Sequence, residues 1–308
     1  FQKLRERLLK LNTISSMLHL GPRCFEEISG EVVQSNTFVI KNEFINNYKP
    51  TFVRLVDFNN PQQKEGILLT GKHRFSNITQ LDFAKIPGSP IAYWVSYKIR
   101  DIFEKVIKFG NIEKPRQGMS TNDNERFLRM WYEVNFIKIG FSYKNSYDAK
   151  ESKLKWFPYN KGGGFRKWYG NNSYLVNWEN DGKDIKEWLV NNPQDPDTTH
   201  WSRRIINTEY YFKEGITWSD ISTGNFACRK SLPGFLFDVK GSSVFPDGEN
   251  RNYIIGFLNS KFTTFCLKLL NPTMTYQVGN IASLPIIFPS SESVKTLIDT
   301  LVQENIQI

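Results

Sequence analysis

The sequence is poor in cysteine and histidine, and it lacks any long apolar run. Its three cysteines, Cys24, Cys228 and Cys266, lie far apart and form no CxxC pair. Neither a disulfide framework nor a zinc site is therefore expected, and a reducing cytoplasm is the simplest location. The longest apolar stretches, such as "PIIF" and "YIIGFL", are far shorter than the roughly 20 residues that span a bilayer, and no signal peptide is present. We therefore expect a soluble cytoplasmic protein without a membrane partner.

Motifs of catalysis and of cofactor binding are also missing. The histidines His19, His73 and His200 share no local pattern with one another or with an acid, which favours surface or packing roles. No GxSxG, HExxH or GxGxxG motif occurs, and the glycines at 162–164 are not followed by the GK[ST] of a phosphate loop. The stretch "PDGEN" at 246–250 is typical of a turn rather than of a metal site. The sequence thus predicts no catalytic residue, no metal ligand and no cofactor-binding residue in this chain.

The chain does contain material for a core, an excess of positive charge and many aromatic rings. Hydrophobic residues make up 40% of the 308 residues, which is enough for one large domain or two ordinary ones. The 40 Lys and Arg residues outnumber the 31 Asp and Glu residues, and the net charge of +9 favours anionic partners such as nucleic acid. Aromatic residues reach 15%, so flat faces are available both for packing and for stacking on bases.

Periodicity predicts a mixed α+β fold. A first helix is expected over 1–20, with Leu4, Leu8, Leu11 and Leu18 on one face. A second is expected over 90–109 with Ser89 as its cap, and a third from a cap at Thr121 or Asn122 to Val134. Two more are expected over 252–270 and from Ser291 onward. Strands are expected over 30–40, 51–58, 135–141 and, as short pieces, 216–245. The two strands before residue 58 lack partners in the surrounding sequence, and the chain starts at Phe1 within a helical pattern. Both features indicate a piece of a longer protein.

One stretch, "KWFPYNKGGGFRKWYGNN" at 155–172, combines six aromatic residues, four cations and four glycines without an acid. From Tyr143 to Asn172 there are seven cations and two acids, so more than half of the net charge lies here. Cations can replace the counterions of phosphates, and aromatic faces can stack on bases, each stack contributing about 1–3 kcal/mol. The sequence therefore predicts a nucleic-acid contact. Two alternatives stay open: Trp156, Phe157 and Trp168 can anchor a glycine loop on the core, and the rings can stack on sugars, although glycan sites usually add acids.

A second polar stretch, "KPRQGMSTNDNERF" at 114–127, places Arg116 and Gln117 before the expected start of a helix. Free N–H groups at a helix start can hold a phosphate. Arg and Gln side chains can also bind the edges of guanine and adenine through paired hydrogen bonds. The stretch therefore adds candidate base contacts, with a plain polar loop and helix cap as the alternative.

Several long blocks of the chain follow one another as they do in a known family. They are "LGPRCFEEISGEVVQSNTFVI", "KIPGSPIAYWVS", "KPRQGMSTNDNERFLRMWYEV", "KWFPYNKGGGFRKWYGNNSYLVNWEND", "ITWSDISTGNFACR", "FDVKGSSVFP" and "GFLNSKFTTFCLKLLNPT…YQVGNIASLPI". These blocks resemble the PglX adenine-specific DNA methyltransferases of bacterial BREX phage-defence systems. The resemblance covers nearly the whole chain, and it implies the C-terminal part of a larger protein.

In that family an N-terminal core binds S-adenosylmethionine, and an Asn-Pro-Pro-Tyr motif holds the flipped adenine for N6 methylation. The nearest matches here, Asn-Pro-Gln at 192–194 and Asn-Pro-Thr at 271–273, lack the second proline and the aromatic residue. The resemblance therefore transfers no catalytic residue to this chain, which we expect to be inactive alone. No cofactor is expected in it, and S-adenosylmethionine is implied only for the full-length parent.

The resemblance also implies a division of the chain. Residues 1–58 resemble the C-terminal tail of a methyltransferase fold, residues 59–290 a DNA target-recognition region, and residues 291–308 form a C-terminal helix. The end of the middle region is similar to the specificity domains of type I and type IIG restriction-modification proteins. We therefore predict a part that recognises a sequence in double-stranded DNA.

The predicted site residues follow from side-chain chemistry. The predicted phosphate contacts are Lys155, Lys161, Arg166 and Lys167. The predicted stacking or wedge residues are Trp168 and Tyr169, and the predicted base readers are Arg116, Gln117, Asn171 and Asn172. The alternative function is a protein-interaction platform that docks other BREX components, or that is captured by an acidic phage inhibitor mimicking DNA.

Overall fold

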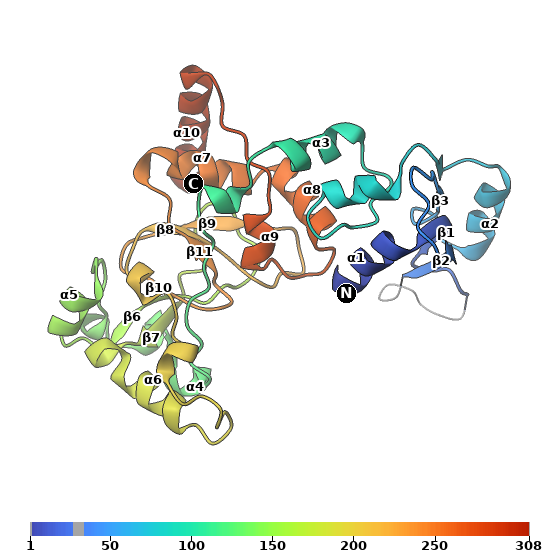
Figure 1. Cartoon of the computed structure of the whole chain (residues 1–308). Helices are drawn as coiled ribbons and strands as arrows, with labels where there is room; N and C mark the ends of the chain where they lie inside the picture. Colours follow the sequence, from blue (N-terminus) through green and yellow to red (C-terminus); the bar gives the residue numbers. More distant parts are fainter. Residues whose placement is uncertain (1, 27–33, 308) are drawn as a thin grey trace. The chain divides into compact units, whose positions relative to one another are not determined.

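The computed structural model describes residues 2–26 and 34–307, and it combines helices with small mixed sheets (Figure 1). The predicted α+β class is thereby confirmed. The chain forms two compact units, Phe1–Val106 and Ile107–Ile308. These bounds differ from the three predicted segments, whose functional meaning stays a prediction. No helix among the described residues combines the length and apolar composition that crossing a membrane requires.

The first unit is built around a four-stranded sheet with the order β2-β1-β3-β4. Its elements are α1 (Gln2–Leu11), β1 (Thr13–Gly21), β2 (Ser35–Lys41), β3 (Thr51–Arg54), α2 (Pro61–Leu69), β4 (Arg74–Phe75), the 3₁₀ turn η1 (Gln80–Lys85) and α3 (Tyr97–Lys105). Strand β1 is antiparallel to β2 and parallel to β3. Buried Leu9, Ile14, Phe52, Phe83 and Tyr93 belong to its core, in which the rings of Phe52 and Tyr93 stack at 4.5 Å.

The helix predicted over 1–20 is too long. The observed helix α1 ends at Leu11, and the chain continues as strand β1. Leu18, assigned to the helical face, lies in this strand opposite Thr37 of β2. β1 hydrogen-bonds to a neighbour on each side, and this pairing outweighs the local helical spacing of its leucines. It is also the partner that the two isolated strands lacked. Part of the expected strand at 30–40 lies outside the described residues.

The predicted helix at 90–109 is correct only over Tyr97–Lys105. Helix α3 begins at Tyr97 and is capped by Ser96, whose hydroxyl accepts from the Ile99 N–H at 3.4 Å. Ser89 has a φ of 47°, in the left-handed region, and does not cap a helix. Residues before the cap instead carry Tyr93 into the core, so burial of an aromatic ring overrides the helical periodicity there.

The second unit contains two sheets, with the orders β10-β6-β7-β5 and β11-β8-β9. Its regular elements are η2 (Phe109–Asn111), α4 (Asn124–Phe127), β5 (Leu128–Met130), η3 (Trp131–Glu133), η4 (Phe136–Lys138), α5 (Ser146–Glu151), β6 (Trp156–Asn160), β7 (Tyr174–Asn177), α6 (Glu179–Asn191), η5 (Trp201–Arg203), η6 (Thr208–Tyr210), β8 (Gly215–Trp218), β9 (Cys228–Ser231), β10 (Leu236–Phe237), β11 (Ser243–Val244), α7 (Gly248–Leu258), α8 (Lys261–Leu270), α9 (Val278–Ala282) and α10 (Glu292–Gln307). The short strands expected over 216–245 and the last helix are confirmed.

Two predictions around residues 121–141 are wrong. Helix α4 has only four residues and is capped by Asp123, not by Thr121 or Asn122. The chain then pairs with β7 as β5, which removes the expected helical continuation to Val134. The strand expected at 135–141 contains the 3₁₀ turn η4 instead, and its extended structure is limited to an isolated bridge between Ile139 and Trp156.

The helix expected over 252–270 is two helices, α7 and α8, separated at Asn259. The Asn259 side chain hydrogen-bonds to both backbone groups of Cys228 in β9, at 3.0 Å each. This long-range contact interrupts the helix, and Ser260 then caps α8. The "PDGEN" stretch begins α7 rather than forming an isolated turn. Val302 of α10 lies over Gly256 of α7, so the last helix belongs to the second unit.

Candidate nucleic-acid interface

Residues 161–173, here called the cationic loop, connect β6 to β7 and fold back onto the other sheet. The Trp168 N–H donates to the Cys228 carbonyl at 3.0 Å, and the Trp168 carbonyl accepts from the Lys230 N–H at 2.7 Å. Arg116 pairs in a similar way with Ser243 at the opposite edge of that sheet. The order is therefore Arg116, β11, β8, β9, Trp168. Because neighbouring strands lie about 4.8 Å apart, the backbones of Arg116 and Trp168 are separated by about 19 Å.

The cationic loop has an unusual backbone. Five of its residues have φ values between 60° and 120°: Gly162, Gly163, Trp168, Gly170 and Asn171. Trp168, with a φ of 69°, is the centre of a three-residue turn closed by the Tyr169 N–H donating to the Lys167 carbonyl at 2.8 Å. Such turns are rare for a bulky residue. Docking on β9 thus fixes the half-buried Trp168, while Tyr169 is the more exposed ring.

The four predicted phosphate contacts differ in whether their charged groups already have partners within the chain. Lys161 Nζ lies 2.6 Å from the carboxylate of Asp238, which is 1% exposed. Lys167 Nζ donates to the Asn259 carbonyl at 2.8 Å, and Lys155 Nζ lies 3.9 Å from Glu179. Arg166 is exposed at the loop tip, and no hydrogen bond or ion pair joins it to another described residue. Arg166 is therefore the cation best placed to meet an external phosphate.

The two predicted asparagine readers also differ. Asn171 Nδ2 donates to the Gly164 carbonyl at 2.9 Å and so closes the loop on itself. Asn172 is half-buried, and in the described part of the chain its side chain forms no hydrogen bond. The Asn172 amide is therefore available to bind a base, whereas one N–H of the Asn171 amide is already hydrogen-bonded within the loop.

Arg116 is held within the second unit. Its guanidinium lies 4.0 Å from the ring centre of Tyr210 and donates to the Tyr210 hydroxyl at 2.6 Å and to the Asn207 side chain at 3.0 Å. The Asn207 amide also donates to the Gln117 carbonyl at 2.9 Å. Base reading by Arg116 would require exchange of these contacts, whereas the half-buried Gln117 side chain has none among the described residues.

The packing alternative holds for part of the stretch. Phe157 is fully buried in the core, where its ring meets Phe212 edge-on at 5.7 Å. Trp156 and Trp168 are half-buried. The stretch thus contributes β6 to the core and presents its cations and Tyr169 on the loop that follows.

Sequence reasoning missed two buried charged residues beneath this loop. Asp238 accepts from Tyr159 Oη at 2.8 Å as well as from Lys161, and burial, with Asp238 adding to it, raises the pKa of Tyr159 well above its usual value. Arg229 on β9 is 2% exposed, and burial lowers the pKa of its guanidinium to about 10. Both lie more than 50 residues beyond the loop in the sequence, so no local pattern signals them.

An exposed aromatic patch was missed as well. Trp131, Tyr132, Phe136, Ile137 and Phe141 lie close together in sequence and are exposed; the values for Phe136 and Ile137 are 68% and 76%. Phe136 and Phe141 pack on each other at 5.2 Å. Exposed large apolar side chains at this density along the chain are typical of an interaction site. The sequence predicted a helix and a strand here, and exposure could not be read from it.

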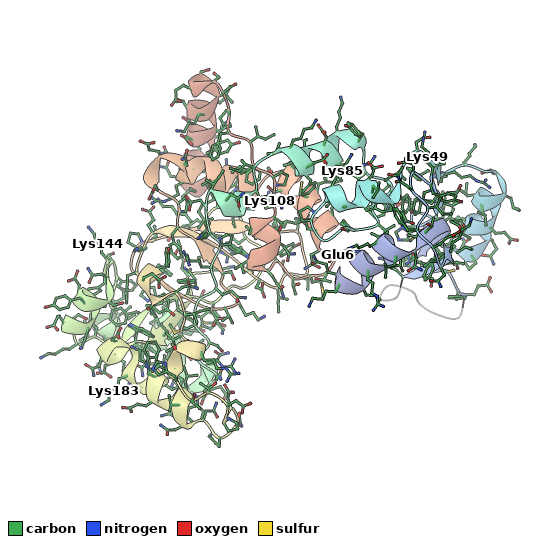
Figure 2. All side chains as sticks on the ribbon, viewed as in Figure 1. Glu6, Lys49, Lys85, Lys108, Lys144 and Lys183 are labelled. Carbon is green, nitrogen blue, oxygen red and sulfur yellow. The ribbon has the colours of Figure 1, made fainter. Side chains whose placement is uncertain are left out.

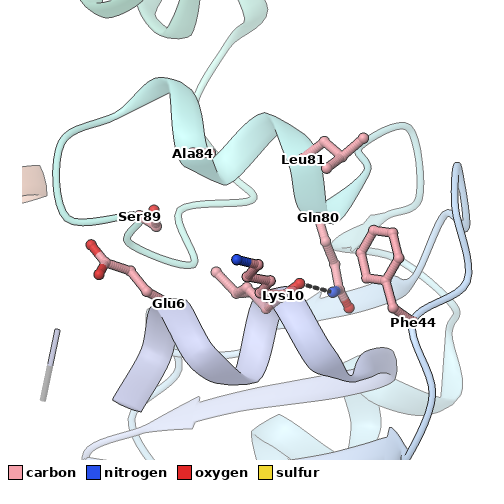
Figure 3. Close-up of a pocket in the computed structure, with 8 residues that line it drawn as sticks. Glu6, Lys10, Phe44, Gln80, Leu81, Ala84 and Ser89 are labelled. Carbon is pink, nitrogen blue, oxygen red and sulfur yellow. Dashed lines mark hydrogen bonds between the residues drawn. The ribbon is translucent and has the colours of Figure 1, made fainter. Parts of the chain in front are cut away.

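The first unit has a pocket of about 330 Å³ between α1 and the η1 turn (Figure 3). Leu9, Phe44 and Leu81 line it, with Glu6 and Lys10 as its charged groups. The Gln80 amide donates to the Leu9 carbonyl at 3.1 Å beside it. This lining has no pattern of catalytic groups. Within residues 2–26 and 34–307, no three His, Cys, Asp or Glu side chains gather as metal ligands would.

Comparison with curated proteins gives two relatives. The chain is 40% identical over 312 residues to the adenine-specific methyltransferase PglX of Lacticaseibacillus casei (strain Zhang), a match to 99% of this chain. It is 39% identical over 292 residues to the adenine-specific methyltransferase BrxX of Escherichia coli O9:H4 (strain HS), a match to 93% of this chain. It spans only 25% and 22% of the length of these relatives. The predicted resemblance is confirmed.

Among solved structures, the fold is similar to that of the type IIL restriction-modification enzyme MmeI, whose structure was solved in complex with DNA. The TM-score is 0.56 at 12% identity, over 98% of this chain and 39% of that one. This similarity shows a shared fold. No protein-family model matches the chain.

Proposed function

We propose, from the similarity of this chain to about a quarter of the methyltransferases PglX and BrxX, that it is the DNA-recognition part of a site-specific adenine-N6 methyltransferase. The parent protein would act in a BREX-type phage-defence system. Double-stranded DNA is the proposed partner. In this proposal the chain binds and orients the DNA, and the rest of the parent protein binds S-adenosylmethionine and carries out the methyl transfer.

The observation that carries this proposal is the cationic loop. It presents Arg166, which has no ion pair with a described residue, the exposed Tyr169 and the amide of Asn172 on a backbone docked to β9. An exposed guanidinium binds phosphate, a ring stacks on bases, and an amide can read a base edge. A docked loop loses less conformational freedom on binding than a free one, which favours affinity.

The chemistry of the parent reaction explains why such a part is needed. A methyltransferase takes its target base out of the duplex, and this costs a few kcal/mol of lost stacking and pairing. Contacts to phosphates and to neighbouring bases must offset that cost. The cationic loop supplies such contacts in the proposal, and its charge also steers DNA toward the site.

The test is binding of the chain to short labelled duplexes across a salt series, followed by fluorescence anisotropy. Non-specific affinity of roughly 10⁻⁴–10⁻⁶ M at physiological salt, falling steeply as salt rises, is expected. Arg166→Ala should weaken binding and lower the slope of log K against log salt by about 1, because one phosphate contact is lost.

The matched control is Lys183→Ala, which removes the same charge from α6. Figure 2 shows Lys183 on the outside of the second unit, and it forms a weak helical pair with Glu187 at 3.8 Å. Equal effects of the two substitutions would assign the binding to net charge rather than to the loop. Absence of binding at low salt by the folded chain would refute a DNA contact by this part alone.

A second function is favoured by the aromatic patch. Its exposed rings fit a protein partner, such as another defence component, better than they fit a phosphate backbone. Competition separates the two functions: an acidic protein that mimics DNA displaces duplex from the cationic loop, whereas a partner docked on the patch leaves duplex binding intact.

A further inference from the structure

Arg229 carries a buried charge for which the structure offers very little compensation. Its two terminal nitrogens share one acceptor, the Ser219 hydroxyl, at 3.4 Å, and its Nε has no hydrogen-bond partner among the described residues. No carboxylate of the described residues forms an ion pair with it. A guanidinium has five N–H donors, and burying it without acceptors is unfavourable.

Other arginines of the second unit show the usual solution. Arg204 lies 2.7 Å from the Asp195 carboxylate, and Arg251 lies 2.8 Å from Glu214. Both are more exposed than Arg229, which is 2% exposed. The most buried of the three therefore lacks the partner that the others have, and this contrast indicates an acceptor from outside the chain.

The cationic loop carries a second arginine past Arg229, because Trp168, two residues after Arg166, forms a β-bridge with Arg229. Burial is the main cause that lowers the pKa of Arg229 to about 10, and the positive charge of Arg166 acts in the same direction. Arg229 therefore stays protonated at neutral pH. Two arginines on paired segments, neither with an ion pair to a carboxylate of the described residues, suit a phosphate group, whose oxygens accept paired hydrogen bonds from arginine.

The cationic loop covers the Ser219 hydroxyl that Arg229 contacts, and the two glycines that follow the covering residue are exposed. Gly162 lies over Ser219, since a Cβ placed on it would come 3.6 Å from the hydroxyl that Arg229 contacts. Gly163 and Gly164 are exposed, and a Cβ on Gly164 would meet nothing within 4 Å. Gly163, with a φ of 119°, gives the loop tip conformational freedom that a residue with a side chain would lack.

We propose that Arg166 and Arg229 bind one phosphate group between them on the inner side of the cationic loop. The exposed Arg166 captures the phosphate first, and the loop tip at 163–166 then moves outward so that an oxygen reaches Arg229. The inference rests on the proposed function, because the natural phosphate is one of the DNA backbone. It adds a contact that the sequence did not suggest.

The first experiment uses inorganic phosphate on the whole chain. Thermal unfolding is followed while potassium phosphate replaces potassium chloride at constant ionic strength. The midpoint of the wild-type second unit should rise by roughly 3–6 °C for each tenfold increase of phosphate above its dissociation constant, because a ligand of the folded state stabilises it. Acetate in place of phosphate should give no such rise.

The variants are Arg229→Gln and Arg166→Gln, with Lys144→Gln as the control. Lys144 is exposed and unpaired among the described residues, and Figure 2 shows it on the outside of the second unit. Both arginine variants should lose the phosphate response, and the control should keep it. A response retained in Arg229→Gln would overturn the proposal and leave a purely structural role.

Two further arms keep the outcome decisive. If Arg229→Gln does not fold, Arg229→Lys takes its place, since lysine keeps the charge but not the paired donors; a full response in Arg229→Lys and Arg166→Gln refutes the phosphate site. In the duplex assay, each arginine variant should lower the salt slope by about 1. A phosphate response without duplex binding would support the phosphate site and refute the proposed function. Duplex binding together with a phosphate response that neither variant changes would support the proposed function and refute the phosphate site.

Discussion

At the scale of residues, buried carboxylates form ion pairs with lysines in and beside the cationic loop. Asp238 accepts from Lys161 at 2.6 Å, and Asp220, also buried, accepts from Lys240 at 3.1 Å. Both acids lie beyond the stretch whose sequence contains none. Lys161 therefore serves mainly to compensate a buried charge, whereas Arg166 keeps its charge for a ligand.

Lys161→Ala should destabilise the second unit, because it leaves Asp238 buried without its cation. Fully buried pairs broken in this way cost about 3–5 kcal/mol. Since the Lys161 side chain is 23% exposed, we expect a loss nearer 2 kcal/mol. Urea unfolding followed by tryptophan fluorescence measures it, with Lys144→Ala as a matched surface substitution. Equal midpoints for the two variants would show that Tyr159 and the backbone satisfy Asp238 without the lysine.

At the scale of elements, the cationic loop is held at both ends by backbone contacts that only certain residues permit. Gly162, with a φ of 93°, would bring a Cβ to 2.8 Å from the Lys240 carbonyl. Trp168 then pairs with β9, and Asn259 joins α7 to the same strand while its carbonyl accepts from Lys167. The loop is thus an added edge of the β11-β8-β9 sheet rather than a free connection.

Gly162→Ala should loosen this loop, because it combines a left-handed backbone with a close contact and costs about 1–3 kcal/mol. Gly164→Ala is the matched control, since its φ lies outside the left-handed region and its Cβ would meet nothing within 4 Å. Limited trypsin digestion reports the effect through cleavage after Arg166 and Lys167. Cleavage should be faster in Gly162→Ala alone. Equal rates in both variants would mean that docking of Trp168 is enough to hold the loop.

At the scale of the whole molecule, the chain consists of two units with separate cores. The core around Phe52 and Tyr93 belongs to Phe1–Val106, and the core around Phe157, Trp178 and Tyr211 belongs to Ile107–Ile308. Every residue predicted to contact DNA lies in the second unit. Units that bury their own apolar residues can fold independently.

A fragment of residues 107–308 should therefore fold and bind duplex DNA nearly as well as the chain. We expect one cooperative unfolding transition and a dissociation constant within about threefold of that of the chain, a difference below about 0.7 kcal/mol. Calorimetry and anisotropy measure the two properties. A folded fragment that binds at least tenfold more weakly would show that the first unit also contributes DNA contacts.

The sequence alone determined the features that depend on neighbours along the chain. The acid-free stretch at 155–172, the short strands at 216–245 and α10 follow from composition and periodicity, and the resemblance to PglX follows from long blocks read in order. The α+β class follows from the same patterns. These signals are local, so no contact between distant residues is needed to see them.

Only the tertiary structure decided what depends on distant residues. β1 became a strand because β2 and β3 pair with it on either side, and Asn259 broke a helix because it hydrogen-bonds to Cys228. Lys161 lies beside Asp238, 77 residues away in the sequence, whereas Arg229 is buried without an ion pair to any described acid. Charge and the capacity to stack can be read from residue types. Whether a charged side chain finds a partner depends on which segments the fold brings together.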